Sequence, residues 1–347
     1  MKNLIQVIVV CFFIGNCFAL TGNGGYVPPI VTVTPTARSA AMGSVGYALA
    51  DDETCLMFNP AGLGFMNFRW NGGAISFMQA NELLPSENLY TITYQNENLN
   101  RLGFSVCLDQ TEQSIERTYI NQNYDIYPDG EFKFYNSFYG IGAGYRFYSN
   151  KAIDNSIGIS MNYSQGTENP SSGPAETSIF GNIGYILQIY DKFRIGLSFK
   201  NIEIAHSNSS DSTGLVSSNS HSPTAFCTGI GYKDSFNGKQ FRVLDLSAEI
   251  SYVDWMSKTL GANSIQTGCE ATFFNTFSAR TGYLDCLSAS EFDFTFGTGL
   301  SFYNHLGIDF YDVFENHDHE TRNYLGFSLS FNRILTWNKS DLKWWLK

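Results

Sequence analysis

The feature that most constrains the fold is an alternation of apolar and polar side chains that recurs from residue 72 to residue 331. In "EFDFTFGTGLSFY", residues 291–303, phenylalanine and leucine fall on one face, whereas Asp, Thr, Gly and Ser fall on the other. The segments "LDLSAEISY" and "YLGFSLSF" repeat this pattern. Because alternation with a period of two residues is the signature of a β-strand, we expect an all-β chain.

The chemistry of the two faces helps to distinguish a soluble β-sandwich from a membrane barrel. The chain has 347 residues with 32 glycines, is 16% aromatic and 15% charged, and has a mean hydropathy of -0.14. A sandwich would bury its apolar face and expose long polar side chains, but here the polar face is rich in Gly and Ser. An apolar face of Phe and Leu around a polar interior is typical of a transmembrane β-barrel.

The connections between predicted strands alternate in length. Short ones such as "YDK", "NGK" and "NTF" alternate with long ones such as "AHSNSSDSTGLVSSNSHSP" and "ENHDHETR". The longest, Thr111–Glu131, separates strands predicted at 100–110 and 132–149. Short periplasmic turns and long outer loops are typical of outer-membrane barrels. We therefore expect a transmembrane antiparallel β-barrel of about 14 strands in the cell outer membrane, with periplasmic termini and extracellular long loops.

The two ends of the chain differ from its middle. "MKNLIQVIVVCFFIGNCFAL" predicts a secretory signal peptide, residues 1–19, with acylation of Cys17 as a less favoured alternative. Residues 332–347, rich in Trp and Lys, suit either the bilayer interface or a disordered periplasmic tail. We therefore divide the chain into a signal peptide (1–19), an N-terminal segment expected to plug the barrel (20–70, the hatch segment), the barrel (71–331) and the tail (332–347).

The composition excludes several functions. A net charge of -11 argues against a nucleic-acid partner, because no basic stripe exists to neutralise phosphates. No phosphate-binding loop, Ser-His-Asp spacing or paired-Cys motif is present, so we expect no enzyme, cofactor, catalytic residue or bound metal. His317 and His319 in "FENHDHET" could chelate a metal, but a solvated loop is favoured. The cysteines are interpreted as small apolar residues, with a Cys107–Cys227 disulfide as the alternative.

Two local features of the sequence predict specific structures. Glu270 and Arg280 lie on the inward face of neighbouring strands that the turn at Asn275-Thr276 joins, so we expect an ion pair in the lumen. In the strand predicted at 193–204, the apolar parity switches after Phe199, so we expect a β-bulge at Lys200-Asn201.

The final strand, "YLGFSLSF", begins with an aromatic residue, has Gly third, and has apolar residues sixth and eighth. This pattern resembles the assembly signal that the outer-membrane insertion machinery reads, although an ordinary amphipathic strand is the alternative. The residues concerned are Tyr324, Gly326, Leu329 and Phe331.

The stretch "TARSAAMGSVGYALADDETCLMFNPAGLGFM", from Thr36 to Met66, resembles the N-terminal signature of the PorV/PorQ family and of its relatives in the FadL-like outer-membrane transporter superfamily. The hairpin "GCEATFFNTFSARTGYL" and the last two strands extend the resemblance to about Phe331. The motif positions are Arg38, Met42, Gly43, Asp51, Asp52, Asn59, Pro60, Ala61 and Gly62.

The resemblance implies a fourteen-stranded barrel with the N-terminal segment folded into its periplasmic mouth. It also implies two functions. PorV/PorQ proteins are accessory components of type IX secretion, which engage secretion components and sorting-domain cargo. FadL-like proteins instead pass hydrophobic small molecules, such as long-chain fatty acids, through the lumen. The length of the chain and the hairpin "GCEATFFNTFSARTGYL" favour the secretion role. The tyrosines of the longest loop, Tyr119, Tyr124 and Tyr127, suit a protein contact. A purely structural barrel is a third class.

The motif residues also have local structural roles in this interpretation. Asp51 or Asp52 is expected to cap a short helix in "ETCLMF". Asn59 is expected to cap the next turn, with Pro60 at its first position. Arg38 is expected to pair with one of the carboxylates. We therefore interpret the acidic run as part of a plug rather than as a metal or catalytic site.

Overall fold

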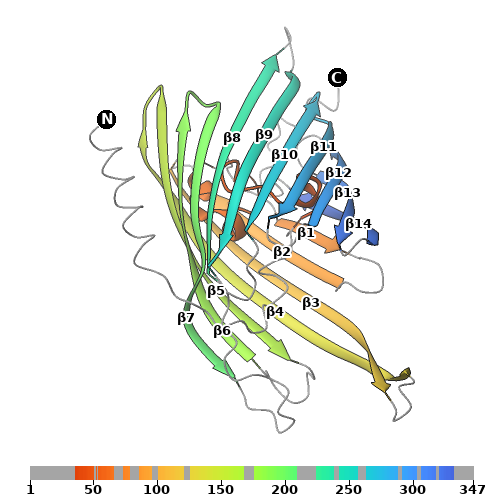
Figure 1. Cartoon of the computed structure of the whole chain (residues 1–347). Helices are drawn as coiled ribbons and strands as arrows, with labels where there is room; N and C mark the ends of the chain where they lie inside the picture. Colours follow the sequence, from red (N-terminus) through yellow and green to blue (C-terminus); the bar gives the residue numbers. More distant parts are fainter. Residues whose placement is uncertain are drawn as a thin grey trace, which may run out of the picture.

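The computed structural model describes the backbone of one closed barrel and of a segment inside it (Figure 1). The described residues are 36–50, 52, 54–65, 73–78, 86–95, 101–120, 126–167, 176–208, 224–237, 242–256, 263–287, 291–302, 306–317 and 320–331. The predicted signal peptide, the tail and Asp51 lie outside these residues.

The strands run in sequence order around the barrel. Each pairs antiparallel with the next, and β1 closes the ring on β14, with Ile75 opposite Leu329. The predicted antiparallel β-barrel is confirmed. The strands with described backbone are β1 (Gly73–Met78), β2 (Ser86–Gln95), β3 (Leu102–Ile120), β4 (Ile126–Ser149), β5 (Ile153–Thr167), β6 (Glu176–Ile189), β7 (Phe193–Asn208), β8 (Ala225–Asn237), β9 (Arg242–Trp255), β10 (Ser264–Phe273), β11 (Phe277–Cys286), β12 (Glu291–Phe302), β13 (Leu306–His317) and β14 (Glu320–Phe331).

Several strands are longer than the sequence pattern predicts. The predicted loop Thr111–Glu131 is mostly strand, because β3 and β4 continue to pair from Glu112↔Tyr135 to Ile120↔Ile126. Likewise, "ENHDHETR" is largely paired between β13 and β14. These ends carry polar residues on both faces, so they show no apolar alternation. Backbone pairing needs only a neighbouring strand, and it therefore extends beyond the part of the strand that the side-chain pattern marks.

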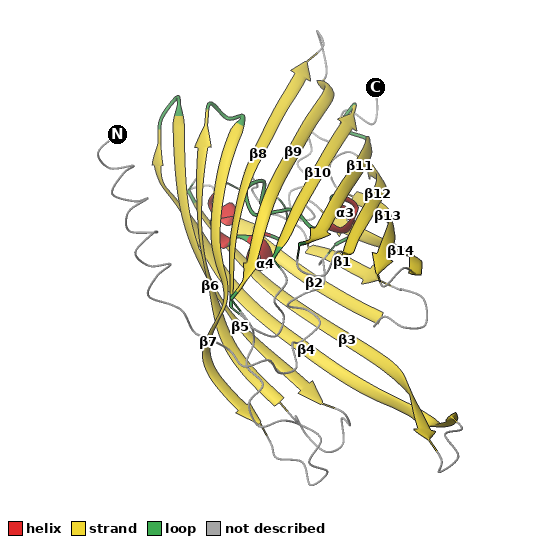
Figure 2. Ribbon diagram, in the orientation of Figure 1, coloured by secondary structure: helices red, strands yellow, loops and turns green. Residues whose placement is uncertain are grey.

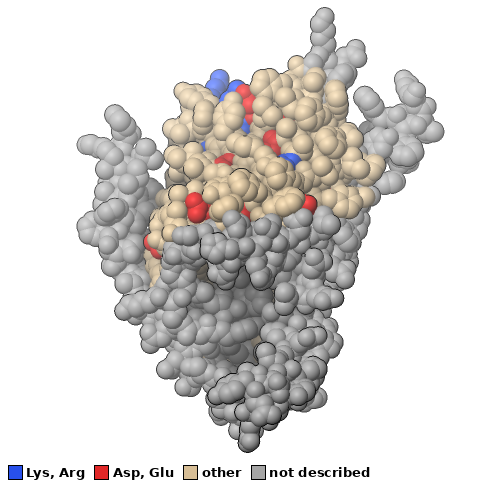
Figure 3. All heavy atoms as spheres, turned by 45° about the vertical axis from the view of Figure 1, so that its right-hand side comes forward, with Lys and Arg blue, Asp and Glu red and all other residues tan. Residues whose placement is uncertain are grey.

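The outer face of the barrel is apolar. Ile141, Ile159 and Phe296 expose 55%, 60% and 50% of their surface. On the face shown in Figure 3, Lys, Arg, Asp and Glu are sparse in the described part. A water-soluble protein rarely exposes a continuous apolar surface of this kind, whereas barrels that span membranes do.

The wall changes its pairing at β7. Ile183 pairs with Phe199 and Gly181 with Ile202, so Lys200 and Asn201 together oppose one residue, which confirms the predicted bulge. Pairing between β7 and β8 ends at Lys200↔Ala225, although β7 continues to Asn208. Figure 1 shows β7 running on past the point where β8 begins. Residues 209–223 lie outside the described part, and we call the place where the described pairing of the two strands ends the β7–β8 seam.

The described part of the hatch segment contains three short helical turns, α3 (Ala37–Ala41), α4 (Cys55–Phe58) and the 3-10 turn η1 (Pro60–Gly64). Asn59 caps η1, and Pro60 occupies its first turn, as expected. The expected cap of α4 by Asp52 is wrong: the N-cap is Thr54, without a side-chain bond. Asp52 instead accepts a hydrogen bond from the Thr54 N–H at 2.9 Å, which forms a turn before the helix. No described helix is long and apolar enough to cross a membrane.

Candidate functional site

The described part of the hatch segment lies inside the barrel (Figure 2). Its apolar side chains are almost fully buried; Leu56 and Leu63 are 0% exposed, and Phe58 is 5% exposed. α3 contacts β11 to β14, whereas η1 contacts β3 to β6. The segment therefore touches opposite parts of the wall at its two ends.

Glycines on the inner face of the wall allow the hatch backbone to approach closely. A methyl group added at Gly158 of β5 would collide with the backbone of Pro60 and Ala61. Only glycine permits so close a contact, because any side chain would occupy the same space. The same holds for Gly184 against Asn59, Gly196 against Tyr47, and Gly268 and Gly282 against Met42 and Gly43.

Asn59 joins η1 to the wall. Its side chain is fully buried, and its Nδ2 donates to the carbonyl oxygens of Tyr47 at 2.7 Å and of Tyr185 and Leu197 at 3.3 Å each. Its Oδ1 accepts from the Ala61 N–H at 3.1 Å. One side chain therefore caps a helix, fixes a second part of the hatch segment and binds two strands. A buried amide with all its groups in use is costly to replace.

Glu249 of β9 binds the hatch backbone directly. Its Oε1 accepts from the N–H groups of Gly46, Tyr47 and Ala48 at 3.2, 2.8 and 3.0 Å, and its Oε2 accepts from Leu49 N–H at 2.7 Å. Ser251 donates to the same Oε1 at 2.5 Å. The residue is 4% exposed. Successive N–H groups that converge on a carboxylate form an anion-binding nest, so this contact compensates the burial of the charge.

A chain of ion pairs, which we call the charge chain, crosses from the wall to the hatch segment. Arg280 of β11 contacts Asp309 of β13 at 2.6 Å and Glu270 of β10 at 2.5 Å. Arg38 of α3 holds the two Glu270 oxygens at 3.0 Å each and Asp52 at 2.6 Å. Glu270 and Arg280 occupy paired positions on β10 and β11. Bidentate contacts between arginine and a carboxylate are strong and directional, and they fix the position of α3 against the wall.

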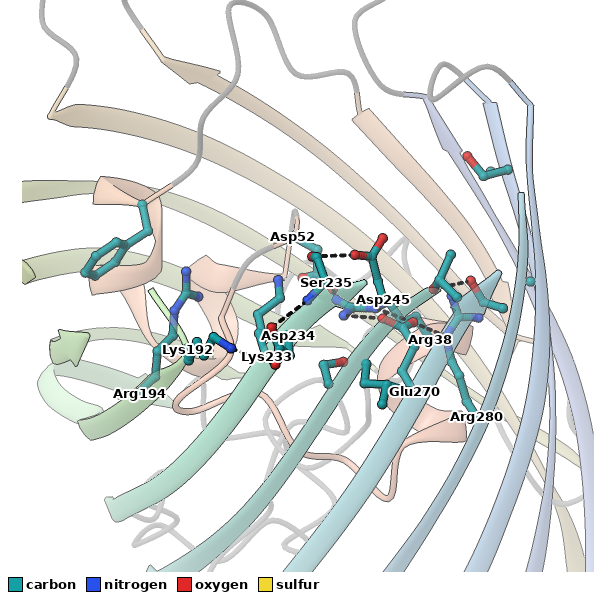
Figure 4. A pocket seen from close by; sticks show the side chains of 18 of the residues that line it. Arg38, Asp52, Lys192, Arg194, Lys233, Asp234, Ser235, Asp245, Glu270 and Arg280 are labelled. Carbon is teal, nitrogen blue, oxygen red and sulfur yellow. Dashed lines mark hydrogen bonds and ion pairs between the residues drawn. The ribbon is translucent and has the colours of Figure 1, made fainter. Parts of the chain in front are cut away.

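A cavity of about 770 Å³ lies at the short-turn end of the barrel, and we call it the polar vestibule. Figure 4 shows Arg38, Glu270 and Arg280 on one side and Lys192 and Arg194 on the other. In the β6–β7 turn, the hydrogen bond from Lys192 to Asp234, at 2.7 Å, raises the pKa of Lys192. The lining combines cations and carboxylates and is therefore suited to water rather than to an apolar molecule.

The hatch segment also has contacts with apolar side chains on the inner wall. Tyr47 and Phe58 pack edge to face at 5.4 Å between ring centroids and join a cluster of wall residues. Burial, with Cys227 nearby, raises the pKa of the Tyr47 phenol well above its usual range, so the phenol is neutral. The wall members of the cluster are Ala225, Cys227 and Val253, with Trp255 packed against them.

The structure therefore places most of the motif residues at the contact between the hatch segment and the inner wall. Arg38 and Asp52 pair directly, Met42 and Gly43 lie on the glycines of β10 and β11, and Asn59 binds the wall. Pro60, Ala61 and Gly62 form η1; the Ala61 carbonyl accepts from Ser156, and Gly62 packs against Ala50. Of the assembly-signal residues Tyr324, Gly326, Leu329 and Phe331, only the backbone in β14 is described.

Sequence reasoning did not identify Glu249 or Asp309 as part of the contact between the hatch segment and the wall. Both are isolated carboxylates on inward faces, and an acidic residue at such a position was the only available signal. Among the described residues, no group of His, Cys, Asp and Glu could hold a metal ion. The five described cysteines are free, so Cys107 and Cys227 are not joined. The side chains of His317 and His319 lie outside the described part.

No family model matches the sequence, and no curated protein matches it. Solved structures do resemble the barrel. CymD, a monoaromatic hydrocarbon channel, matches with a TM-score of 0.56 and 12% identity over 86% of this chain and 97% of its own. The toluene transporter TbuX of Ralstonia pickettii matches with a TM-score of 0.55 and 13% identity over 86% and 97%. TodX of Pseudomonas putida, also a toluene transporter, gives 0.55 and 13% over 90% and 99%. At this identity the similarity is one of fold.

Proposed function

We propose that the protein is an outer-membrane channel for the uptake of hydrophobic small molecules. The observation that carries the proposal is the position of the hatch segment, which lies in the lumen close to the β7–β8 seam: Lys200, the last residue of β7 that pairs with β8, has its ammonium group 5.6 Å from the Tyr47 ring centroid. A channel for apolar solutes needs a closed lumen, so that water-soluble molecules do not leak, and a route that avoids water.

The apolar outer face supports a membrane location, and the predicted signal peptide is consistent with it. A closed barrel satisfies all its backbone hydrogen bonds internally, which hydrocarbon requires. Its exposed isoleucine and phenylalanine side chains then contact lipid tails instead of water. We place the short turns in the periplasm and the long connections outside the cell, because outer-membrane barrels generally have this arrangement.

The chemistry of the inner surface suggests by which route an apolar solute leaves the lumen. The polar vestibule is lined mostly by charged and polar side chains and therefore offers little favourable surface to a hydrocarbon. The rings of Tyr47 and Phe58, which are buried in this structure, would offer one once the hatch segment moves, and the β7–β8 seam lies beside them. An apolar solute that reaches these rings would therefore leave through the seam into the bilayer at lower cost than through the vestibule.

The similar solved structures support this proposal more than they support a role in type IX secretion. TbuX and TodX are toluene transporters, and CymD is a hydrocarbon channel. The motif from Arg38 to Gly62, which suggested the PorV/PorQ family, also resembles FadL-like proteins and does not separate the two roles. Secretion of cargo is therefore the second outcome that an experiment has to measure.

The test compares the parent strain with a strain that lacks the gene and a strain in which it is restored. Uptake of labelled toluene and of a labelled long-chain fatty acid is measured at low external concentration, together with the secretion of proteins that carry C-terminal sorting domains. We expect uptake of at least one hydrophobic compound to fall and secretion to be unchanged. Unchanged uptake with lost secretion would replace the proposal by the secretion role. No change in either would leave a structural barrel.

A further inference from the structure

Asp312 of β13 carries a carboxyl group on the outer face of the barrel. It lies opposite Phe296 of β12, and it shares its strand parity with Phe310 and Phe314. Phe296 and Phe310 each expose 50% of their surface and Phe314 exposes 37%, so this parity faces outward. Directly opposite residues of an antiparallel pair lie on the same face of the sheet, and Asp312 is therefore directed outward as well.

Asp312 lies inside the apolar outer band rather than at its edge. It is near the middle of β13, and exposed apolar residues continue along β12 on both sides of its partner Phe296, with Phe294 in one direction and Leu300 in the other. By contrast, Asp254 and Asp285, which have the same outward parity, are the second-last residues of β9 and β11. A carboxylate at the end of a strand can reach water, whereas one in the middle of the band faces lipid tails.

Within the described residues, the Asp312 side chain has no hydrogen-bonding or ion-pair partner. Its Oδ1 is buried and accepts no hydrogen bond. The rings of Phe296 and Phe314 pack beside it, nearly perpendicular and 6.1 Å apart between centroids, and they have no N–H or O–H group to donate. Lipid tails have no donor either. Asp312 therefore costs the isolated barrel stability, because a polar group in hydrocarbon is unfavourable without a partner.

A second copy of this chain does not offer the missing cation within the described residues. The Lys and Arg residues with described side chains lie in the polar vestibule, in the short turns or against the hatch segment; they are Arg38, Arg101, Arg146, Lys151, Lys192, Arg194, Lys200, Lys233 and Arg280. Two copies with their β13 faces together would instead bring two carboxyl groups near each other, which is unfavourable.

We infer that the outer face of β12 and β13 around Asp312 binds a different membrane-spanning protein, which presents an arginine or a lysine at the depth of Asp312. Ionisable side chains inside a membrane are rare and generally pair with one another. An arginine would supply two donors to the carboxylate, and the exposed rings of Phe296 and Phe310 would pack against the apolar side chains around it.

The position of this face is compatible with transport but does not depend on it. In the ring of strands, β12 and β13 lie across the barrel from β5, β6 and β7 (Figure 1). A protein bound at Asp312 would therefore leave the β7–β8 seam uncovered. The inference goes beyond the proposed transport function, and either can fail without the other.

The first experiment measures the stability of the purified full-length barrel in a non-ionic detergent. The temperature at which the barrel loses its heat-modifiable gel mobility is compared for the wild type, Asp312→Leu and the control Thr298→Leu. Thr298 is exposed on the same face, opposite Phe310, and carries no charge. Asp312→Leu should raise this temperature, and Thr298→Leu should change it less. An unchanged or lower temperature for Asp312→Leu would overturn the inference, because the barrel alone would then satisfy Asp312.

The second experiment looks for the partner in native membranes. The photoreactive residue p-benzoylphenylalanine replaces Phe310, or Ile159 of β5 as a control that is also exposed but lies across the barrel. We expect the probe at 310, but not the probe at 159, to cross-link one membrane protein. Asp312→Leu should lower the yield about tenfold or more, the effect of one charge-assisted hydrogen bond, whereas Asp312→Glu should retain it. Asp312→Asn takes the place of Asp312→Leu in both experiments if that variant does not fold.

The cross-linked protein is identified by mass spectrometry, and each arginine and lysine in its membrane-spanning part is replaced by glutamate. One of these replacements should abolish the cross-link, and Asp312→Lys in the barrel should then restore it. Cross-links to lipid alone, a yield that does not depend on Asp312, or a partner in which no such cation matters would each overturn the inference. None of these results would bear on the uptake experiment.

Discussion

The two ends of the hatch segment meet the barrel in different ways. At the α3 end, Met42 and Gly43 pack on wall glycines, and the charge chain adds ion pairs from Arg38 to Glu270 of the wall and to Asp52 of the segment itself. At the η1 end, contact depends on backbone packed against wall glycines such as Gly158 and on the buried Asn59. Packing on glycine is fixed by shape, whereas the ion pairs, which only the α3 end adds, respond to charge and solvent. We therefore expect the α3 end to open first when the segment moves.

Hydrogen exchange can separate the two ends, because residues 36–49 and 59–65 give different peptides. Each of the following changes is expected to affect one end more than the other. Exchange is measured on the folded, purified barrel, and leakage of a small water-soluble dye from proteoliposomes reports whether the lumen is still closed.

The largest effect is expected for Arg280→Gln at the α3 end. The Arg280 side chain is 6% exposed and neutralises two carboxylates, Glu270 and Asp309. Removing one partner of a buried ion pair costs about 3–5 kcal/mol, because a charge is left without compensation. Exchange in residues 36–49 should rise strongly and that in 59–65 only slightly. Adding Asp309→Asn removes the orphaned charge and should recover part of the protection; no recovery would contradict the electrostatic explanation.

Gly158→Ala should have the next largest effect, and at the opposite end. The added methyl group would collide with Pro60 and Ala61, and overpacking of this kind costs about 1–3 kcal/mol. Exchange in residues 59–65 should rise, while residues 36–49 stay protected. Gly181→Ala is the matched control, because its methyl group would meet nothing closer than 3.4 Å. Equal effects of the two substitutions would mean that the η1 end does not depend on close packing.

Glu249→Gln tests the loop between the two ends. The amide keeps the shape of the carboxylate but turns one acceptor into a donor, which would face the N–H groups of residues 46–49. The loss of hydrogen bonds to a charged group and the unpaired N–H groups cost about 1–3 kcal/mol. Exchange should rise in residues 46–49 first. Ser251→Ala, which removes only the side-chain donor to Glu249, should change it less.

Asp52→Ala should have the smallest effect. The side chains of Asp52 and Arg38 are 18% and 20% exposed, so water partly screens their ion pair. Such pairs contribute about 1 kcal/mol or less. We expect slightly faster dye leakage and faster exchange in residues 36–49. A barrel that is as tightly sealed as the wild type, with unchanged exchange, would show that Asp52 does not hold the segment in place.

Much of the fold can be predicted from the sequence, because alternation fixes which strand face turns outward. The register across the turn at Asn275-Thr276 also predicts that Glu270 and Arg280 are opposite each other. The outer ends of β3 and β4, residues 111–120 and 126–131, cannot be predicted in this way, since they lack a continuous apolar face. The hydrogen bonds that Glu249 accepts from the hatch segment cannot be predicted either. Their donors are backbone N–H groups, about 200 residues away, that have no side-chain signature.

The binding of the hatch backbone by Glu249 has a consequence for how the protein can change over evolution. In the hatch segment Glu249 binds main-chain N–H groups, so these hydrogen bonds do not depend on which side chains Ala48 and Leu49 carry. Both side chains are buried against the wall, so a substitution there changes how the loop packs while the carboxylate continues to hold its backbone. Packing and hydrogen bonding are thus encoded in different atoms of the same residues, and a lineage can vary the first while keeping the second.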